Sequence, residues 1–133
     1  MSALLLITHG NLGESLLAQA HHVMGPLDVE VAVLGVNGKE DIDALSQAAV
    51  NLRDELSKNL VILTDVFGAT PSNIAHQIGH GHPIVHGINL AMLLRASSYP
   101  RLGARELALR LVEGGRQAIF SGDKPPQTTP SNA

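Results

Sequence analysis

The sequence predicts an α/β domain over residues 1–120: a doubly wound, mainly parallel four-stranded sheet with helices on both faces and a short C-terminal antiparallel edge strand. Four short apolar runs of strand type alternate with segments whose apolar residues recur at helical spacing. Strands that alternate with helices form βαβ units, whose strands lie parallel in one sheet. The 133 residues, 44% of them hydrophobic, suffice for the core of one such domain.

The first strand is the apolar run that begins at Leu4 and ends at His9 and Gly10. An uninterrupted apolar run is typical of a strand buried on both faces, so His9 would lie at its carboxyl end, where open α/β sheets hold their ligands. Helical spacing begins directly afterwards, at Leu12, Leu16, Leu17, Ala20 and Val23. The free N–H groups of that helix would favour an anion on His9.

The other elements follow from the same patterns. Strands are expected at 29–34, 60–64 and 84–88, and helices at 42–56, 71–78 and 89–94. A last helix is expected around 107–112, ended by Gly114-Gly115 and followed by a short edge strand from Gln117 to Phe120. Residues 121–133 show no periodicity, which predicts a disordered tail.

A second predicted strand also ends on polar residues. The run 60–64 ends on Thr64 and is followed by Asp65, and the loop after it contains Gly68 and leads to Thr70, the expected N-cap, and Pro71. If these strands are adjacent at the switch point of the sheet, the carboxylate meets the imidazole of the first strand. Accepting a hydrogen bond from its Nδ1–H would leave Nε2 free as a nucleophile.

Together these features predict a phosphohistidine site at His9. The helix that starts near Gly10 and the loop from Gly68 through Ala69 to Thr70 would supply N–H donors for an anion on Nε2. Each residue also has a simpler interpretation: a histidine after a strand is often a structural hydrogen-bonding residue, and an aspartate such as Asp65 is often a turn or cap carboxylate. The coincidence of two polar strand ends and two helix N-termini favours function.

Composition excludes several other classes. Only three aromatic residues and a net charge of −3 without a basic run argue against a nucleic-acid partner. Zero cysteines exclude thiolate chemistry, and the lack of a leader or membrane-spanning stretch predicts a cytoplasmic protein. No Walker loop or Gly-rich dinucleotide motif follows the first strand, so no cofactor is expected.

Four histidines between residues 76 and 86 invite a metal interpretation. His76 and His80 have helical i, i+4 spacing, and His82 and His86 follow. No carboxylate lies among them, however, and Pro83 with its neighbouring glycines predicts a loop. A native metal site is therefore not expected.

Three segments resemble the enzyme IIA domain of the mannose family of the phosphoenolpyruvate-dependent sugar phosphotransferase system. They are Leu-Ile-Thr-His9-Gly10, the segment from Thr64 to Asn73, and the segment from Gly87 to Leu93. The resemblance implies that His9 accepts a phosphoryl group on Nε2 from the phosphocarrier HPr and passes it to a IIB partner. It also implies that Asp65 orients His9 and that Thr70, with its neighbouring backbone, helps to hold the phosphate.

The same resemblance suggests a homodimer, in which the C-terminal strand Gln117 to Phe120 crosses to the other subunit's sheet. A IIA chain of this kind would associate indirectly with the membrane components IIC and IID in sugar uptake, or would act as a regulatory phosphorylation sensor. The phosphotransfer subunit that feeds dihydroxyacetone kinase resembles the same IIA fold and ranks below the sugar-system interpretation.

Three alternatives stay open from the residues. Metal chelatases of tetrapyrrole synthesis also begin with an apolar strand ending in His-Gly, although the segment from Asp65 to Asn73 is not expected there. A phosphoglycerate-mutase-like phosphatase would have arginine where Thr8 stands. The protein could also be a non-catalytic dimeric regulatory module, and phosphorylation of His9 would not exclude this. Transfer of the phosphate to a IIB protein would distinguish a relay from such a module.

Overall fold

The computed structural model describes residues 1–127. This part of the chain contains four strands and five helices, in the order β1 Ala3–His9, α1 Leu12–Met24, β2 Glu30–Val36, α2 Ile42–Glu55, β3 Leu60–Thr64, α3 Thr70–Ile78, β4 Ile84–His86, α4 Leu90–Ala96 and α5 Ala104–Gln117. None of the described helices is long and apolar enough to cross a membrane.

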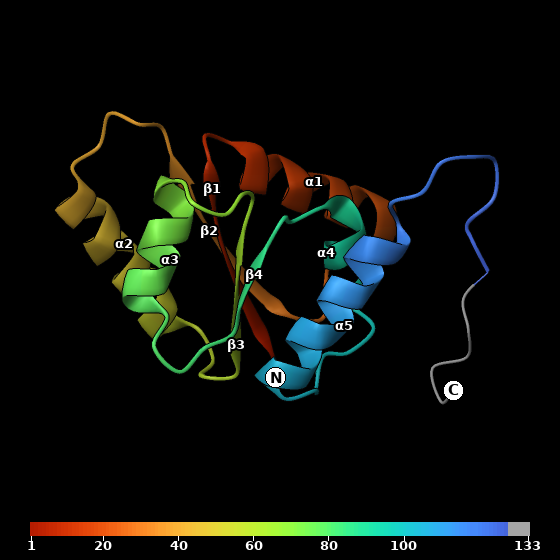
Figure 1. The fold of residues 1–133 in the computed structure, drawn as a ribbon. Helices are drawn as coiled ribbons and strands as arrows, with labels where there is room; N and C mark the ends of the chain where they lie inside the picture. Colours follow the sequence, from red (N-terminus) through yellow and green to blue (C-terminus); the bar gives the residue numbers. More distant parts are fainter. Residues whose placement is uncertain (128–133) are drawn as a thin grey trace.

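The four strands form one parallel sheet in the order β2-β1-β3-β4 (Figure 1). The chain moves outward from β1 to β2 and then returns to the other side of β1 with β3, so the switch point lies between β1 and β3. All strands run upward in Figure 1, and the loops after β1, β3 and β4 lie along the upper edge. The predicted fold class is confirmed.

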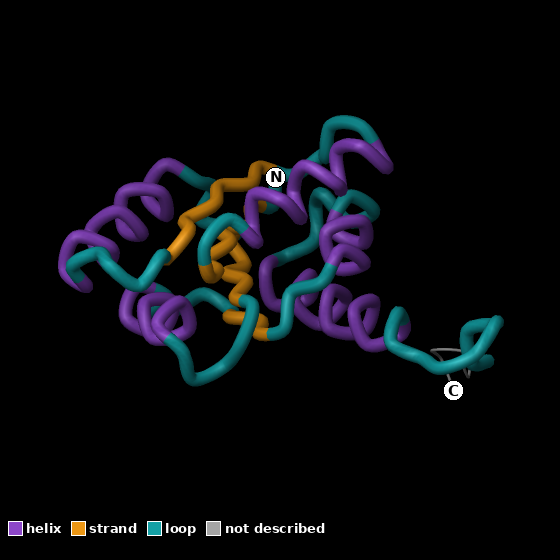
Figure 2. Tube along the Cα trace, turned by 90° about the horizontal axis from the view of Figure 1, so that it is seen from above, coloured by secondary structure: helices purple, strands orange, loops and turns teal. Residues whose placement is uncertain are grey.

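Helices cover both faces of the sheet. α2 and α3 pack on one face, and α1, α4 and α5 pack on the other (Figures 1 and 2). Strand β1 contributes Leu4 and Leu6 to the core under α1, α4 and α5, and Leu5 and Ile7 to the core under α2 and α3. The unbroken apolar run of β1 is therefore explained by burial on two sides, and its first polar side chain to reach solvent is at the carboxyl edge.

The prediction that Gly114-Gly115 ends the last helix is wrong, because α5 continues to Gln117. A Cβ on Gly115 would lie 2.5 Å from Cε of Met92, and one on Gly114 would lie 3.1 Å from Cγ of Arg95. The two glycines therefore allow α5 to approach α4 closely, and packing outweighs their low helix propensity.

The predicted edge strand from Gln117 to Phe120 is not formed within the single chain. Gln117 is the last residue of α5, and Ile119 N–H donates to the carbonyl of Arg116 at 3.1 Å, so the backbone makes a turn at the helix end. Exchange of this strand between two subunits stays a prediction. Residues 121–127 form neither helix nor strand, their predicted disorder is untested, and the rest of the predicted tail lies outside the described residues.

Strand β4 is shorter than predicted because the chain turns at Gly87, whose φ is +87°. The N–H groups of Gly87 and Ile88 both donate to the carbonyl of Thr64 at 3.0 Å, which brings the end of β4 against the end of β3. Asn89 then caps α4 as predicted, accepting from Met92 N–H at 3.0 Å.

Candidate functional site

His9 occupies the carboxyl end of β1, and its side chain is 51% exposed. The chain reverses immediately at Gly10, where φ is +50° and the N–H donates to the carbonyl of Val36 at 2.8 Å. A Cβ on Gly35 would lie only 2.2 Å from the carbonyl oxygen of Gly10, so only glycine fits at that position of β2. Gly10 therefore contributes to the site through its backbone conformation. Its N–H is not available to an anion, because it already donates to Val36.

The N-terminus of α1 is fixed beneath His9 by Thr8. The buried hydroxyl of Thr8 accepts from Gly13 N–H at 2.9 Å, while Asn11 at the N-cap position makes no side-chain hydrogen bond to the helix. Gly13 allows this close approach, because a Cβ there would lie 2.9 Å from Val33 Cγ1. The positive end of the α1 dipole therefore lies directly after His9 in the chain.

Asp65 holds His9 through two hydrogen bonds. Its Oδ2 accepts from the backbone N–H of His9 at 3.0 Å and lies 2.7 Å from the imidazole Nδ1. Its Oδ1 accepts from Val66 N–H at 3.0 Å. The convergence of His9 and Asp65 that the sequence predicted is present in the structure.

The charge on Asp65 fixes the tautomer of His9. Burial raises the pKa of Asp65, but the hydrogen bonds from the His9 amide and imidazole outweigh it, so the pKa lies below the usual aspartate range. The ionised carboxylate only accepts hydrogen bonds, so Nδ1 carries the proton and Nε2 of the neutral ring holds the lone pair. Among the described residues Nε2 has no hydrogen-bond partner.

The loop after Asp65 leads into the N-terminus of α3. Gly68 adopts a φ of +89°, and Ala69 is the N-cap, accepting from Asn73 N–H at 3.0 Å through its carbonyl. Thr70 is the first helical residue, so its prediction as N-cap is wrong by one position. Because Ala69 has no capping side chain, the N–H groups of this first turn have no side-chain partner.

The site therefore contains an exposed imidazole whose Nδ1 is hydrogen-bonded to a carboxylate. Two helices begin shortly after these residues in the chain, α1 after β1 and α3 after β3. That arrangement is typical of a histidine that takes up an anionic group. Comparison with known proteins assigns the family. Residues 3–106 match the model of the mannose-type enzyme IIA family, described as "PTS system fructose IIA component". The chain belongs to this family of IIA components of the sugar phosphotransferase system.

Solved structures of IIA proteins share the fold. The mannose/sorbose-specific IIA subunit from Enterococcus faecalis is 27% identical with a TM-score of 0.83, and the match covers 96% of this chain and 98% of that one. An EIIA component from Streptococcus agalactiae is 21% identical with a TM-score of 0.79, over 91% and 97% of the two chains. No curated protein matches the sequence significantly.

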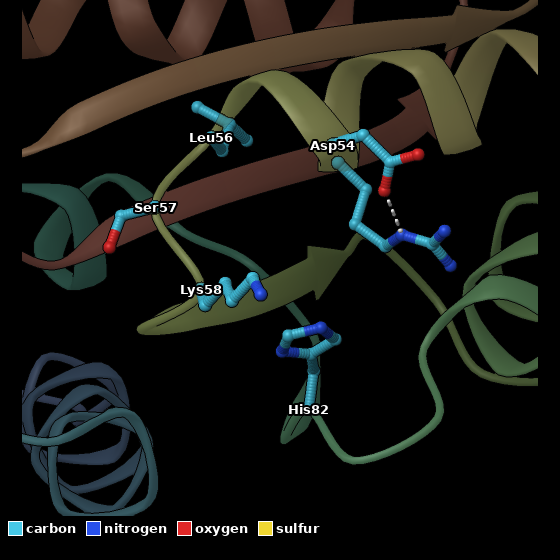
Figure 3. Close-up of a pocket in the computed structure, with 6 residues that line it drawn as sticks. Asp54, Leu56, Ser57, Lys58 and His82 are labelled. Carbon is cyan, nitrogen blue, oxygen red and sulfur yellow. Dashed lines mark hydrogen bonds and ion pairs between the residues drawn. The ribbon is translucent and has the colours of Figure 1, made fainter.

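The four histidines considered as metal ligands do not lie together in the structure. The rings of His76 and His86 stack with centroids 5.4 Å apart at the carboxyl edge of the sheet. His82 precedes β4 and lines a hollow of about 400 Å³ at the opposite edge, with Arg53 and Lys58 (Figure 3). Within residues 1–127 no group of three or more histidine or acidic side chains is arranged to hold a metal ion.

The sequence interpretation missed the residues that support the site from below. Thr8 and Thr64 are fully buried, and their hydroxyls bond Gly13 N–H and the imidazole of His86. A threonine at the end of an otherwise apolar strand was the available signal. For Gly35 no sequence signal marked the close approach of the loop after β1.

Proposed function

We propose that this IIA component relays a phosphoryl group through His9, accepting it from phospho-HPr and donating it to a IIB partner. The observation that carries the proposal is the 2.7 Å contact between Nδ1 and Oδ2 of Asp65, which leaves the exposed Nε2 with the lone pair. Membership of the IIA family supports the same reaction type. It also favours this function over the tetrapyrrole chelatase.

In the first step, the Nε2 lone pair attacks the phosphorus of the phosphohistidine on HPr. The bond between phosphorus and the HPr nitrogen breaks, and its electron pair returns to the HPr imidazole. His9 becomes positively charged as the new bond forms, and the Asp65 carboxylate stabilises that charge through Nδ1–H. In the second step the IIB nucleophile attacks the phosphorus, the bond between phosphorus and Nε2 breaks, and its electron pair returns to the His9 imidazole, which becomes neutral again.

The phosphoryl oxygens need hydrogen-bond donors, and backbone N–H groups are the main candidates. The chain that enters α3, at Gly68, Ala69 and Thr70, offers N–H groups, and the N-cap residue Ala69 has no capping side chain. The Thr70 hydroxyl adds one side-chain donor. Phosphoryl transfer depends mainly on positioning and on electrostatic stabilisation, and fixed backbone donors and helix dipoles provide both.

The proposal is tested by intact-mass spectrometry after incubation with phosphoenolpyruvate, enzyme I and HPr. We expect one acid-labile phosphoryl adduct in the wild type and none in His9→Ala, with His80→Ala as a matched control because His80 lies on the exposed α3–β4 turn. Addition of a cognate IIB protein should remove the adduct. An adduct that persists in His9→Ala contradicts the site, and an adduct that no IIB protein removes favours the regulatory module.

We also propose a homodimer that uses the C-terminal end of α5. Ile119 and Phe120 are 75% and 42% exposed directly after this helix. Ile119 lines a groove with His86 and Met92 beside β4, which has no strand partner on its outer side among the described residues. Light scattering should give twice the mass of the chain, and Ile119→Ser with Phe120→Ser should shift it to the monomer.

A further inference from the structure

A cluster of three rings adjoins the site and has no part in the relay as described. Phe67 stands in the loop after Asp65, His76 lies on α3, and His86 ends β4. The two imidazoles are stacked, with an interplanar angle of 22°. Phe67 meets both of them edge to face, with centroid distances of 6.1 Å to His76 and 5.1 Å to His86.

Both imidazoles are anchored to the protein by Nδ1. His76 Nδ1 lies 2.8 Å from the carbonyl of Ser72, which only accepts, so this nitrogen carries the proton. His86 Nδ1 lies 2.5 Å from Oγ1 of Thr64, the buried residue that directly precedes Asp65. The stacked rings therefore join α3, β4 and the end of β3 beside the carboxylate that holds His9.

The Phe67 side chain is otherwise largely exposed to solvent. Its side chain is 71% exposed, and its neighbours Val66 and Gly68 are exposed as well. Gly68, with a φ of +89°, has open space around it and offers no side-chain contact. The two imidazoles therefore provide the ring contacts that hold this loop, which joins Asp65 to the first turn of α3.

We propose that His76 and His86 are positioning residues for the relay, which hold the loop of residues 66–69 through Phe67 while both rings are neutral and release it when the pair is protonated. Two imidazolium charges at this separation repel each other, and the stack loses its support. The role rests on the proposed function of His9, whereas the protonation-dependent contact can be tested without it.

The surrounding charges set the pH at which the contact is lost. Burial, and then the charge of His76, lower the pKa of His86 below its usual value of 6.5. Arg116 on α5 lines the same groove as His86, whereas Asp65 is engaged by His9. Because the folded pKa is lowered, the stack is complete above about pH 6.5 and is lost as the pH falls below it.

The direct test follows the Gly68 amide by NMR during a pH titration in a His9→Ala background, which removes the titration of His9 itself. We expect the Gly68 signal to move with the same midpoint as the His86 ring. The step should vanish in both His86→Phe and His76→Phe, because each variant keeps a ring in the stack but leaves a single imidazole, so two imidazolium charges cannot form. His80→Phe is the matched control and should leave the step unchanged.

A Gly68 step that persists unchanged in both phenylalanine variants would overturn the proposal. If His86→Phe does not fold, the presence or loss of the Gly68 step in His76→Phe decides the question, because His76 is exposed on α3. The functional arm compares phosphorylation rates by phospho-HPr at about pH 7.5 and about pH 5.5, and the acid loss should be smaller in His86→Phe than in wild type. An equal loss of rate in wild type and His86→Phe contradicts the positioning role of the two histidines. If the wild type is not phosphorylated at all, only the proposed relay through His9 is contradicted.

Discussion

Replacing Asp65 by Asn tests how far the reactivity of His9 depends on one carboxylate. Three N–H groups now share its two oxygens: the His9 amide, the His9 Nδ1 and the Val66 amide. An asparagine side chain has a single acceptor oxygen, so it cannot serve all three. Its NH₂ group must face at least one N–H, which disturbs either the tautomer of His9 or the start of the loop.

The size of the effect follows from the bond that is lost. A hydrogen bond to a charged group contributes about 1.5–3 kcal/mol. The Nδ1 bond is short, at 2.7 Å, and Asp65 is only 11% exposed, so solvent screens it weakly. If the whole amount is lost as positive charge develops on His9, phosphorylation slows by roughly 10- to 150-fold.

The assay is rapid-quench phosphorylation of Asp65→Asn by phospho-HPr under single-turnover conditions. Asp41→Asn is the matched control, because Asp41 also accepts a backbone N–H, from Ala44, but caps α2 away from the site. Asparagine caps helices as well as aspartate does, so this control should keep the wild-type rate. A rate for Asp65→Asn within about twofold of wild type would refute the orienting role.

Three further predictions concern stability and pH. Gly35→Ala places a Cβ 2.2 Å from the Gly10 carbonyl oxygen and should destabilise the fold by about 1–3 kcal/mol in urea unfolding. Asn89→Ala removes the α4 cap and the bond from Nδ2 to the Gly115 carbonyl at 3.2 Å, and should cost about 1–2 kcal/mol, measured as a lower Tm. Because its folded pKa is lowered, Asp65 stabilises the fold above about pH 4 and loses this effect as the pH falls through the folded pKa, so the stability gap between wild type and Asp65→Asn should narrow in acid.

Each of these predictions has a control. Gly103→Ala should lower stability by less than Gly35→Ala, because a Cβ at Gly103 meets nothing within 4 Å. Asn89→Asp should retain most of the cap, since aspartate is an equally good N-cap residue. A stability gap between wild type and Asp65→Asn that stays constant from pH 7 to pH 3 would show that the ionised carboxylate does not stabilise the fold.

The sequence was most informative where one physical signal dominated. The runs that form β1 and β3 are apolar on both faces because helices cover both sides of the sheet. This pattern, with the alternation of strands and helices along the chain, predicted parallel strands. His9 and Asp65 interrupt those patterns at the strand ends, where burial stops. Their meeting followed from strand order, and the order β2-β1-β3-β4 confirmed it.

The sequence was least informative where tertiary packing decided the outcome. Gly114 and Gly115 have low helix propensity, yet they lie inside α5 because α4 packs closely against them. The stacking of His76 on His86 depends on the path of the α3–β4 loop, which no local pattern specified. Local propensity also gave no sign that the chain from Gln117 onward would end α5 and turn, where the sequence predicted a strand.

The central claim is that Nε2 of His9 carries the phosphoryl group while Nδ1 stays bonded to Asp65. Its most direct test is NMR of the phosphorylated protein with ¹⁵N-labelled histidine, in which the bonded ring nitrogen shows coupling to ³¹P. We expect that coupling at Nε2 of His9, with the proton still on Nδ1. Coupling at Nδ1, or at any other histidine, would contradict the account.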